Sequence, residues 1–323
     1  MKTRKSVVIL LLSILAALRF FPTQAMAADR MDPGQEVSLT LSYLDEGIPL
    51  AGAEFDLHLI ATVDDYGELT ISETVRQFNV DIRGENDDAW KALASTLEGF
   101  VLRDKITPVD SGSTNEQGTL VFPRQGGRLA WGLYLVQGHR HIQGGYVYDA
   151  APFVVMLPSW DREVNEWVYD VTVNPKYSSQ PESDDRITRK VLKVWKDEGN
   201  EKSRPEEVIV QLLQDGAVYD TVALNAANNW RYTWENLDGN SRWTMVEKEM
   251  DDYTVTVTRE GVTFVVTNTY TGDTPAAPPG KPAEPKLPQT GQLWWPVPFL
   301  LAVGILLVLI GLICRRGIEN EER

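Results

Sequence analysis

Three polar residues, Lys193, Glu247 and Asn268, each continue an otherwise apolar or aromatic face of a predicted strand. Side chains alternate between the two faces of a strand, so each of these residues points with its apolar neighbours two positions away. Burying all three is costly unless they satisfy one another. Burial also favours the neutral amine of lysine, which is a nucleophile, and the protonated carboxyl of glutamate.

The three residues lie in one strand-rich segment, residues 186–270. Its alternating pattern predicts seven strands, at 188–195, 207–214, 218–224, 230–234, 242–248, 253–258 and 262–269. Seven short strands in a segment of this length are typical of a small immunoglobulin-like β-sandwich. We therefore expect residues 186–270 to form a separate second domain with little room for a catalytic cleft.

This second domain resembles the B-type repeat domain of collagen adhesins and pilins. The resemblance is carried by residues 193–197 (KVWKD), 210–216 (VQLLQDG) and 267–270 (TNTY). In that family a first-strand lysine and a last-strand asparagine join in an intramolecular isopeptide bond, assisted by a buried acid. The resemblance implies Lys193 and Asn268 as the joined pair and Glu247 as the acid.

The chemistry of the three side chains agrees with this implication. A protonated Glu247 can hydrogen-bond the amide oxygen of Asn268 and polarise its carbonyl. Attack by the Lys193 amine then expels ammonia once, which is self-crosslinking and not turnover. The alternative is a buried Lys193–Glu247 ion pair capped by Asn268, with no bond. Lys190 is a weaker candidate because its parity places it with the opposite face.

A second lysine, Lys176, ends the segment 167–176, WVYDVTVNPK. This segment resembles the pilin motif W-x-x-x-V-x-V-Y-P-K, with Asn174 in place of the tyrosine. In that family the lysine attacks the sortase thioester of the next subunit. Strand parity places Lys176 on the polar face, where an acceptor amine must lie. The alternative is a solvated lysine at a strand end.

Residues 28–177 are expected to form a first β-sandwich domain with one helical insertion. Predicted strands lie at 36–43, 51–59, 119–122, 132–137, 153–157 and 167–173, and residues 86–88 (NDD) are expected to form the N-cap region of a helix whose apolar face runs from 90 to 101. The domain resembles the N-terminal domain of sortase-assembled pilins at 49–55 and 132–136. Its first strand has no lysine, so we expect no internal bond there. His139 and His141 are expected to be solvated loop residues, and no metal site is predicted.

The C-terminal segment, residues 287–323, resembles the cell-wall sorting signal of Gram-positive surface proteins. It contains Leu287-Pro288-Gln289-Thr290-Gly291, an uncharged run at 293–313 and a tail at 314–323 in which Arg315 and Arg316 lie next to the run. The run is long enough to cross a bilayer as a transmembrane helix, and the arginines favour a cytoplasmic tail. The resemblance implies that a sortase cleaves between Thr290 and Gly291 and passes Thr290 to an amine. The alternative is an ordinary membrane anchor.

The other end of the chain predicts export. Residues 1–27 have a basic start, an apolar helical stretch and an Ala25-Met26-Ala27 cleavage site, which together indicate a signal peptide. Residues 177–185 are polar and predict an interdomain linker. The proline-rich residues 271–286 favour an extended spacer through the cell wall.

Composition limits the partners. The chain has 31 Lys and Arg against 46 Asp and Glu, for a net charge of −15. Such a charge argues against nucleic-acid binding, which requires neutralisation of phosphates. The single cysteine, Cys314, follows the expected membrane span, so the exported part has no disulfide. No cofactor is predicted.

Three functions remain open from the sequence. The first is a structural pilus subunit that a sortase joins to other pilin subunits or to the peptidoglycan precursor. The second is a monomeric wall-anchored adhesin with a host or matrix ligand. An anchored enzyme is the weakest of the three, because no nucleophile–base–acid set or metal cluster is visible in the sequence. In each case the expected location is the cell wall, with the precursor held in the membrane.

Overall fold

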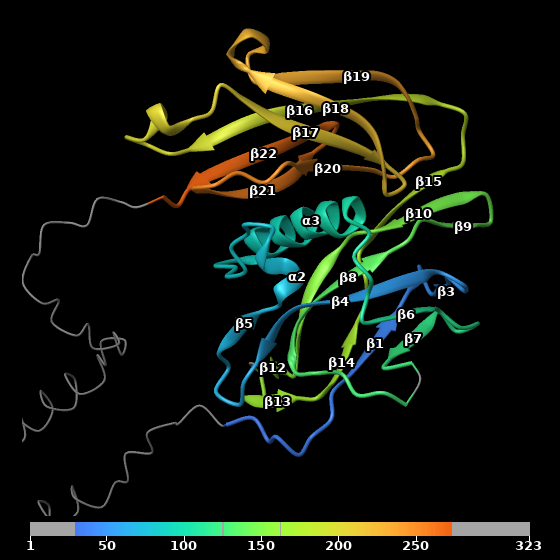
Figure 1. Cartoon of the computed structure of the whole chain (residues 1–323). Helices are drawn as coiled ribbons and strands as arrows, with labels where there is room; N and C mark the ends of the chain where they lie inside the picture. Colours follow the sequence, from blue (N-terminus) through green and yellow to red (C-terminus); the bar gives the residue numbers. More distant parts are fainter. Residues whose placement is uncertain (1–29, 125, 162, 273–323) are drawn as a thin grey trace, which may run out of the picture. The chain divides into compact units, whose positions relative to one another are not determined.

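The computed structural model describes residues 30–272, except residues 125 and 162. They form two β-rich domains, coloured from blue to green and from yellow to orange in Figure 1. The expected signal peptide (1–27), nearly all of the proline-rich segment and the sorting signal (287–323) lie outside the described residues. Within the described part of the chain, no helix is long and apolar enough to cross a membrane.

The first domain consists of short strands and two helices. In chain order its strands are β1 (Ser38–Ser42), β2 (Leu44–Asp45), β3 (Ile48–Pro49), β4 (Glu54–Val63), β5 (Leu69–Ile71), β6 (Asp110–Ser113), β7 (Thr119–Phe122), β8 (Gly132–Gly138), β9 (His141–Gln143), β10 (Tyr146–Ala150), β11 (Phe153–Leu157), β12 (Ser159–Asp161), β13 (Glu166–Val168), β14 (Asp170–Val173) and β15 (Tyr177–Pro181). The helices are α2 (Glu73–Arg76) and α3 (Asp87–Arg103). The predicted class, a β-sandwich with a helical insertion, is confirmed.

Three sheets form the body of this domain. Their strand orders are β11-β8-β4-β5 with β6 on β4, β14-β1-β7, and β15-β10-β9. The first strand β1 runs parallel to β14 and antiparallel to β7. Alternation along β1 buries Leu39 and Leu41 in a core with Phe55, Phe122 and Tyr134, as the period-two pattern predicts.

Helix α3 begins within the predicted cap region at 86–88, and Asn86 is its N-cap residue. The side chain of Asn86 accepts a hydrogen bond from the backbone N–H of Ala89 at 2.9 Å, which satisfies one of the free donors of the first turn. Asp87 and Asp88 follow in that turn, where negative charge is favourable. The helix buries Leu93, Leu97, Phe100 and Val101 along one face.

The second domain has seven strands in two facing sheets. The strands are β16 (Arg186–Lys196), β17 (Glu207–Gln214), β18 (Ala217–Asn225), β19 (Arg231–Asp238), β20 (Trp243–Glu247), β21 (Tyr253–Glu260) and β22 (Thr263–Tyr270). Their orders are β19-β16-β22-β21 and β18-β17-β20, and two short 3₁₀ helices lie at Glu201–Ser203 and Ala226–Asn228. All seven predicted strands are present, and the immunoglobulin-like sandwich is confirmed.

Two predictions about the end of the first domain need correction. Residues 177–181, predicted as linker, form β15, which pairs antiparallel with β10 from Tyr177 to Pro181. The polar composition is explained by exposure, because most side chains of this strand face solvent. The single strand predicted at 167–173 is two strands, since β13 pairs with β12 while β14 pairs with β1.

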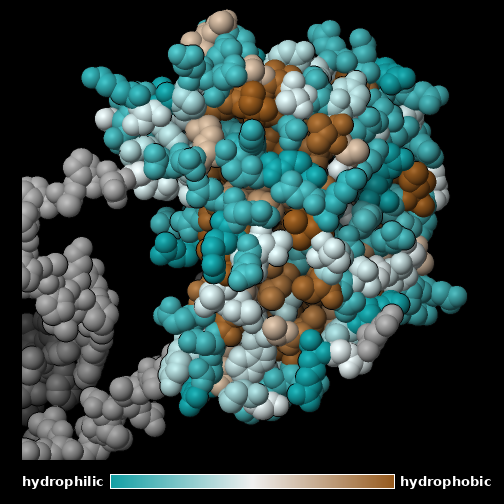
Figure 2. Space-filling view, viewed as in Figure 1, coloured by the Kyte–Doolittle hydropathy of each residue, from teal (hydrophilic) through white to brown (hydrophobic). Residues whose placement is uncertain are grey.

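The visible surface is mostly polar, with small separate apolar patches (Figure 2). Scattered apolar residues of this kind are normal on protein surfaces.

Candidate functional site

Strands β16 and β22 lie side by side and parallel, with Trp195 opposite Asn268 and Lys193 opposite Val266. Alternation turns Lys193 and Asn268 to the interior of the sandwich together with Val191 and Val266. The lysine and the asparagine are therefore diagonal neighbours on one buried face, a relation in which long side chains reach one another.

Glu247 reaches the same space from the opposite sheet. It is the last residue of β20, which pairs with β17 so that Glu247 lies opposite Val210. The side chains of Lys193 and Glu247 are 0% and 1% exposed, and Asn268 is 1% exposed. The structure thus brings together the three residues that the strand pattern predicts to meet.

The polar atoms of this cluster are within contact distance. Glu247 Oε2 lies 3.3 Å from Lys193 Nζ, longer than a typical charge-assisted hydrogen bond. Glu247 Oε1 accepts a 2.5 Å hydrogen bond from Asn268 Nδ2. Lys193 Nζ otherwise has only long contacts with the carbonyls of Val194 and Val266, at 3.4 and 3.5 Å. Its ammonium is weakly solvated by the protein.

Burial dominates the electrostatics. It lowers the pKa of the Lys193 amine to about 8, although the Glu247 carboxylate acts in the opposite direction. Burial also raises the pKa of Glu247, against the pull of Lys193 and the hydrogen bond from Asn268. Both shifts favour a neutral amine beside a protonated carboxyl, the pair of forms needed for nucleophilic attack with acid assistance.

The amide of Asn268 is oriented differently from the expectation. Its nitrogen, and not its oxygen, faces Glu247, and Oδ1 has no hydrogen-bond partner among the described residues. A buried carbonyl oxygen without a donor is unfavourable. In this arrangement the carboxyl lies next to the nitrogen that would leave as ammonia.

Aromatic and thioether groups complete the pocket. Lys193 Nζ lies 4.4 Å from the ring centroid of Trp195, a contact that stabilises the cationic form. Asn268 Nδ2 also contacts Met250 Sδ at 3.8 Å. Lys190, by contrast, is exposed on the outer side of β16 and does not compete for the site.

Lys176 lies between β14 and β15 and is exposed. Its backbone is held in place, because its carbonyl accepts a 2.7 Å hydrogen bond from the N–H of Ala151. Its ammonium has no ion pair or hydrogen bond with any described residue. Asp170, Thr172 and Asn174 share the exposed face, as the parity predicts.

Lys176 is one of the residues that line a groove of about 640 Å³. It is lined mainly by apolar side chains, with α3 contributing one wall through Trp90. Further lining residues are Leu133, Phe153, Val154, Met156 and Val173. The exposed amine therefore lies at the edge of an apolar surface.

In the first domain the first strand, β1, also runs parallel to a strand near the end of the domain, β14, but β1 turns only apolar side chains to the core. The positions of β1 that face the core hold Leu39 and Leu41.

Two histidines of the first domain, His139 and His141, are not simply the solvated loop residues that the sequence predicted. His139 is exposed, but its Nε2 lies 2.7 Å from Oδ2 of Asp56, and His141 belongs to strand β9. Among the described residues no three His, Cys, Asp or Glu side chains form a metal-binding group.

The strand pattern did not indicate what covers the outer face of β20. All five of its residues are buried, whereas a sandwich strand normally exposes alternate side chains. The sequence does contain one indication that this outer face is covered. The residues of β20 that point outward, Thr244 and Val246, are uncharged. The covering element, α3, is more than 130 positions away in the sequence and could not be inferred from it.

Two family matches cover most of the chain. Residues 189–269 match the family described as Cna protein B-type domain. Residues 19–178 match the Gram-positive pilin subunit D1, N-terminal domain. Among curated proteins, a collagen adhesin of Staphylococcus aureus is 38% identical over 111 residues, which is 31% of this chain and 9% of the relative. The chain thus spans only a small part of that protein.

Solved structures give weaker likenesses. A single B repeat unit of the collagen-binding protein of Staphylococcus aureus is 18% identical, covering 73% of this chain and 99% of the other, with a TM-score of 0.25. The full-length major pilin SpaD of Corynebacterium diphtheriae is 17% identical over 74% of this chain and 65% of its own, with a TM-score of 0.28. At these TM-scores the superpositions carry no argument about function.

The buried pair can be tested apart from any covalent bond, in an Asn268→Ala background. Lys193→Met should lower the free energy of unfolding by about 3–5 kcal/mol at neutral pH, because it leaves Glu247 buried without a counter-charge. Adding Glu247→Leu should recover most of the loss, since an apolar pair replaces the ionisable one. Urea denaturation measures both. Equal stability of the single and double variants would contradict the close pairing.

Proposed function

We propose that this chain, which matches a Gram-positive pilin domain followed by a Cna B-type domain, is a structural pilus subunit on the cell surface. Both matched families consist of structural domains of surface proteins and not of enzymes. The observation that carries the pilus assignment is Lys176, an exposed amine on a fixed backbone at the end of a pilin-like motif. A sortase would join it to Thr290 of another copy.

The domain organisation proposed here follows the sequence. A signal peptide at 1–27 directs export, and the domains at 28–177 and 186–270 form the folded part. The segment 271–286 is a spacer, and Leu287–Gly291 is the sortase motif before the membrane span at 293–313 and the tail at 314–323. Sortase would release Gly291 and transfer the Thr290 carbonyl to Lys176 of a neighbour or to the peptidoglycan precursor.

The second proposal is an intramolecular isopeptide bond between Lys193 and Asn268. The neutral Lys193 Nζ attacks Asn268 Cγ, and a new C–N bond forms as the Cγ–Nδ2 bond breaks. The amine loses one proton, Nδ2 gains one and leaves as ammonia, and Glu247 mediates the transfer. The contact of Glu247 Oε1 with Nδ2 supports this role.

Such a bond would reinforce a domain that has no cysteine. It would link the first and last strands and so close nearly the whole domain into one loop. By analogy with a disulfide across a long loop, the link would stabilise the domain by ~4 kcal/mol. Tension entering through one end of the domain would pass directly from β16 to β22.

A monomeric adhesin is the alternative, and the similarity to a collagen adhesin favours it. In this case the same sorting signal would attach each copy singly to peptidoglycan, and a host or matrix ligand would bind the folded part. The two proposals differ in one property, the presence of covalent polymers.

Formation of the bond predicts a mass change. The protein from Ala28 to Thr290 should be about 17 Da lighter than its sequence, because one ammonia is lost. Lys193→Ala and Glu247→Ala should each restore the full mass and lower the melting temperature. Intact-mass spectrometry decides the matter, with Lys190→Ala as the matched control that keeps the loss. An unmodified wild-type mass would refute the bond.

The reaction should have a bell-shaped pH dependence, because the Lys193–Glu247 pair must hold one proton in total. Burial lowers the pKa of the Lys193 amine to about 8 and raises the pKa of Glu247, so the two groups compete for this proton. In alkali the pair loses the proton and no acid remains, whereas in acid the pair holds a second proton and the ammonium cannot attack. Denatured, unlinked protein diluted into a series of buffers would report the rate of mass loss. A rate that keeps rising in alkali would exclude Glu247 as the acid.

Polymerisation should depend on Lys176. Lys176→Ala should remove the high-molecular-weight, detergent-resistant ladder from wall extracts and leave a monomer that wall hydrolases release, because the acceptor amine is gone while the sorting signal remains. Lys105→Ala, at another exposed lysine of the first domain, is the control. A ladder unchanged by Lys176→Ala rejects this acceptor, and a single band in the wild type favours the adhesin.

A further inference from the structure

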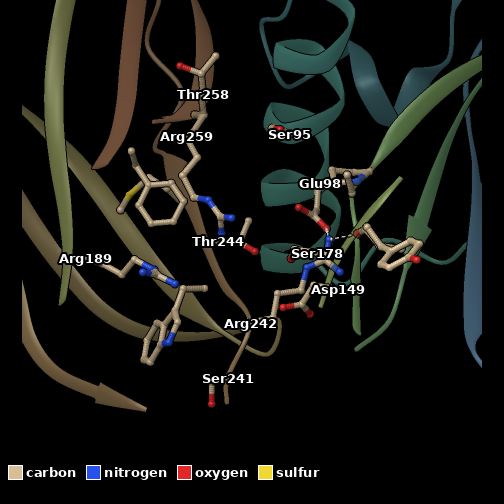
Figure 3. A pocket seen from close by; sticks show the side chains of 18 of the residues that line it. Ser95, Glu98, Asp149, Ser178, Arg189, Ser241, Arg242, Thr244, Thr258 and Arg259 are labelled. Atoms are coloured by element: carbon tan, nitrogen blue, oxygen red, sulfur yellow. Dashed lines mark hydrogen bonds and ion pairs between the residues drawn. The ribbon is translucent and has the colours of Figure 1, made fainter. Parts of the chain in front are cut away.

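Strand β20, which carries Glu247, is held at both ends by helix α3 of the first domain. Just before the strand, Arg242 pairs with Glu98 of α3, and it also donates to the carbonyls of Gly138 and Ala150 at 2.7 and 3.0 Å. Figure 3 shows Arg242 directed toward Glu98 on the helix. Just after the strand, Glu249 pairs with Arg103, in the last turn of α3.

Between these two ion pairs the helix lies directly against the strand. A Cβ atom built on Gly99 would be only 2.7 Å from the carbonyl oxygen of Met245 and 3.3 Å from Val246 Cβ. Glycine is unfavourable inside a helix, so its presence at the point of contact fits a need for close approach. Val246, on the outer face of β20, is 1% exposed because α3 covers it.

Strand β21, which follows β20 in the chain but belongs to the facing sheet, is also hydrogen-bonded to the first domain. It is an edge strand, and free backbone donors on such an edge need partners. The N–H of Val257 donates to Thr96 Oγ1 at 2.8 Å. Asn79 Nδ2 donates to the carbonyls of Met250 and Tyr253, both at 2.8 Å, and so fixes the loop that follows Glu247.

We propose that α3 is a positioning element for the cross-linking reaction of the second domain. The helix holds β20 in place, and with it the carboxyl of Glu247 between Lys193 and Asn268. This inference rests on the proposed isopeptide bond. None of the α3 residues touches the reacting atoms, so Glu98, Gly99 and Arg103 act only through the strand.

The position of Glu247 makes this support necessary. Glu247 is the last residue of β20, and beyond it only the backbone of Lys248 bonds back to β17, through the carbonyl of Ile209. A strand end that frays by 1 Å would separate the carboxyl from both partners. A misplacement of that size costs on the order of 100-fold in rate when geometry controls a reaction. The ion pair at Glu249 limits this fraying.

The test compares Gly99→Leu and Glu249→Gln with Glu235→Gln, a control on the exposed side of β19. Each protein, containing both domains, is diluted from denaturant, and loss of ammonia is followed by mass spectrometry. We expect Gly99→Leu and Glu249→Gln to cross-link at least about tenfold more slowly than the control. The acid limb of their pH–rate profile should also move to lower pH, because a loosened Glu247 is better hydrated.

Circular dichroism and resistance to protease establish that each variant is folded. If Gly99→Leu fails to fold, Glu249→Gln, which changes one partly exposed side chain, carries the test. Folded variants that cross-link at the wild-type rate with an unchanged pH profile would overturn the positioning role alone. A wild-type protein that never loses ammonia would refute the bond itself, and the positioning role with it.

Discussion

A lysine, a glutamate and an asparagine occupy a space between two sheets that solvent does not reach, and the second domain is arranged around them. Each group would lose its hydration on folding, and its closest polar side-chain partners are the other two. The fold meets that requirement by pairing the first strand, β16, with the last, β22, and by ending β20 of the facing sheet at Glu247, beside Lys193 and Asn268. The same dry setting moves the pKa values of the amine and the carboxyl toward their neutral forms.

Two lysines in this chain have the same functional group and different environments. Lys193 is enclosed, so it can react only with a neighbour in its own domain. Lys176 is exposed between β14 and β15 and lines an apolar groove, so it is open to a second molecule. In the first domain β1 has Leu39 and Leu41 at the corresponding core positions, in an apolar cluster with Phe55 and Phe122. Environment, and not residue type, separates the two roles proposed for lysine.

The two domains share one continuous core. Phe100 and Leu97 of α3 belong to the same buried cluster as Met245 and Val257 of the second domain. Relative motion of two domains is expected unless a large apolar interface joins them. Here helix α3 of the first domain packs directly on β20 of the second.

The alternation of apolar and polar residues along the sequence was enough to predict many features of the fold, because the period of two in a strand depends only on near neighbours in the sequence. It predicted all seven strands of the second domain, the helix N-cap region at 86–88, and the burial of Lys193, Glu247 and Asn268. Only the tertiary structure decided which way the Asn268 amide faces, that residues 177–181 pair with β10, and that α3 covers β20. These features join residues far apart in the sequence, and no local preference specifies such contacts.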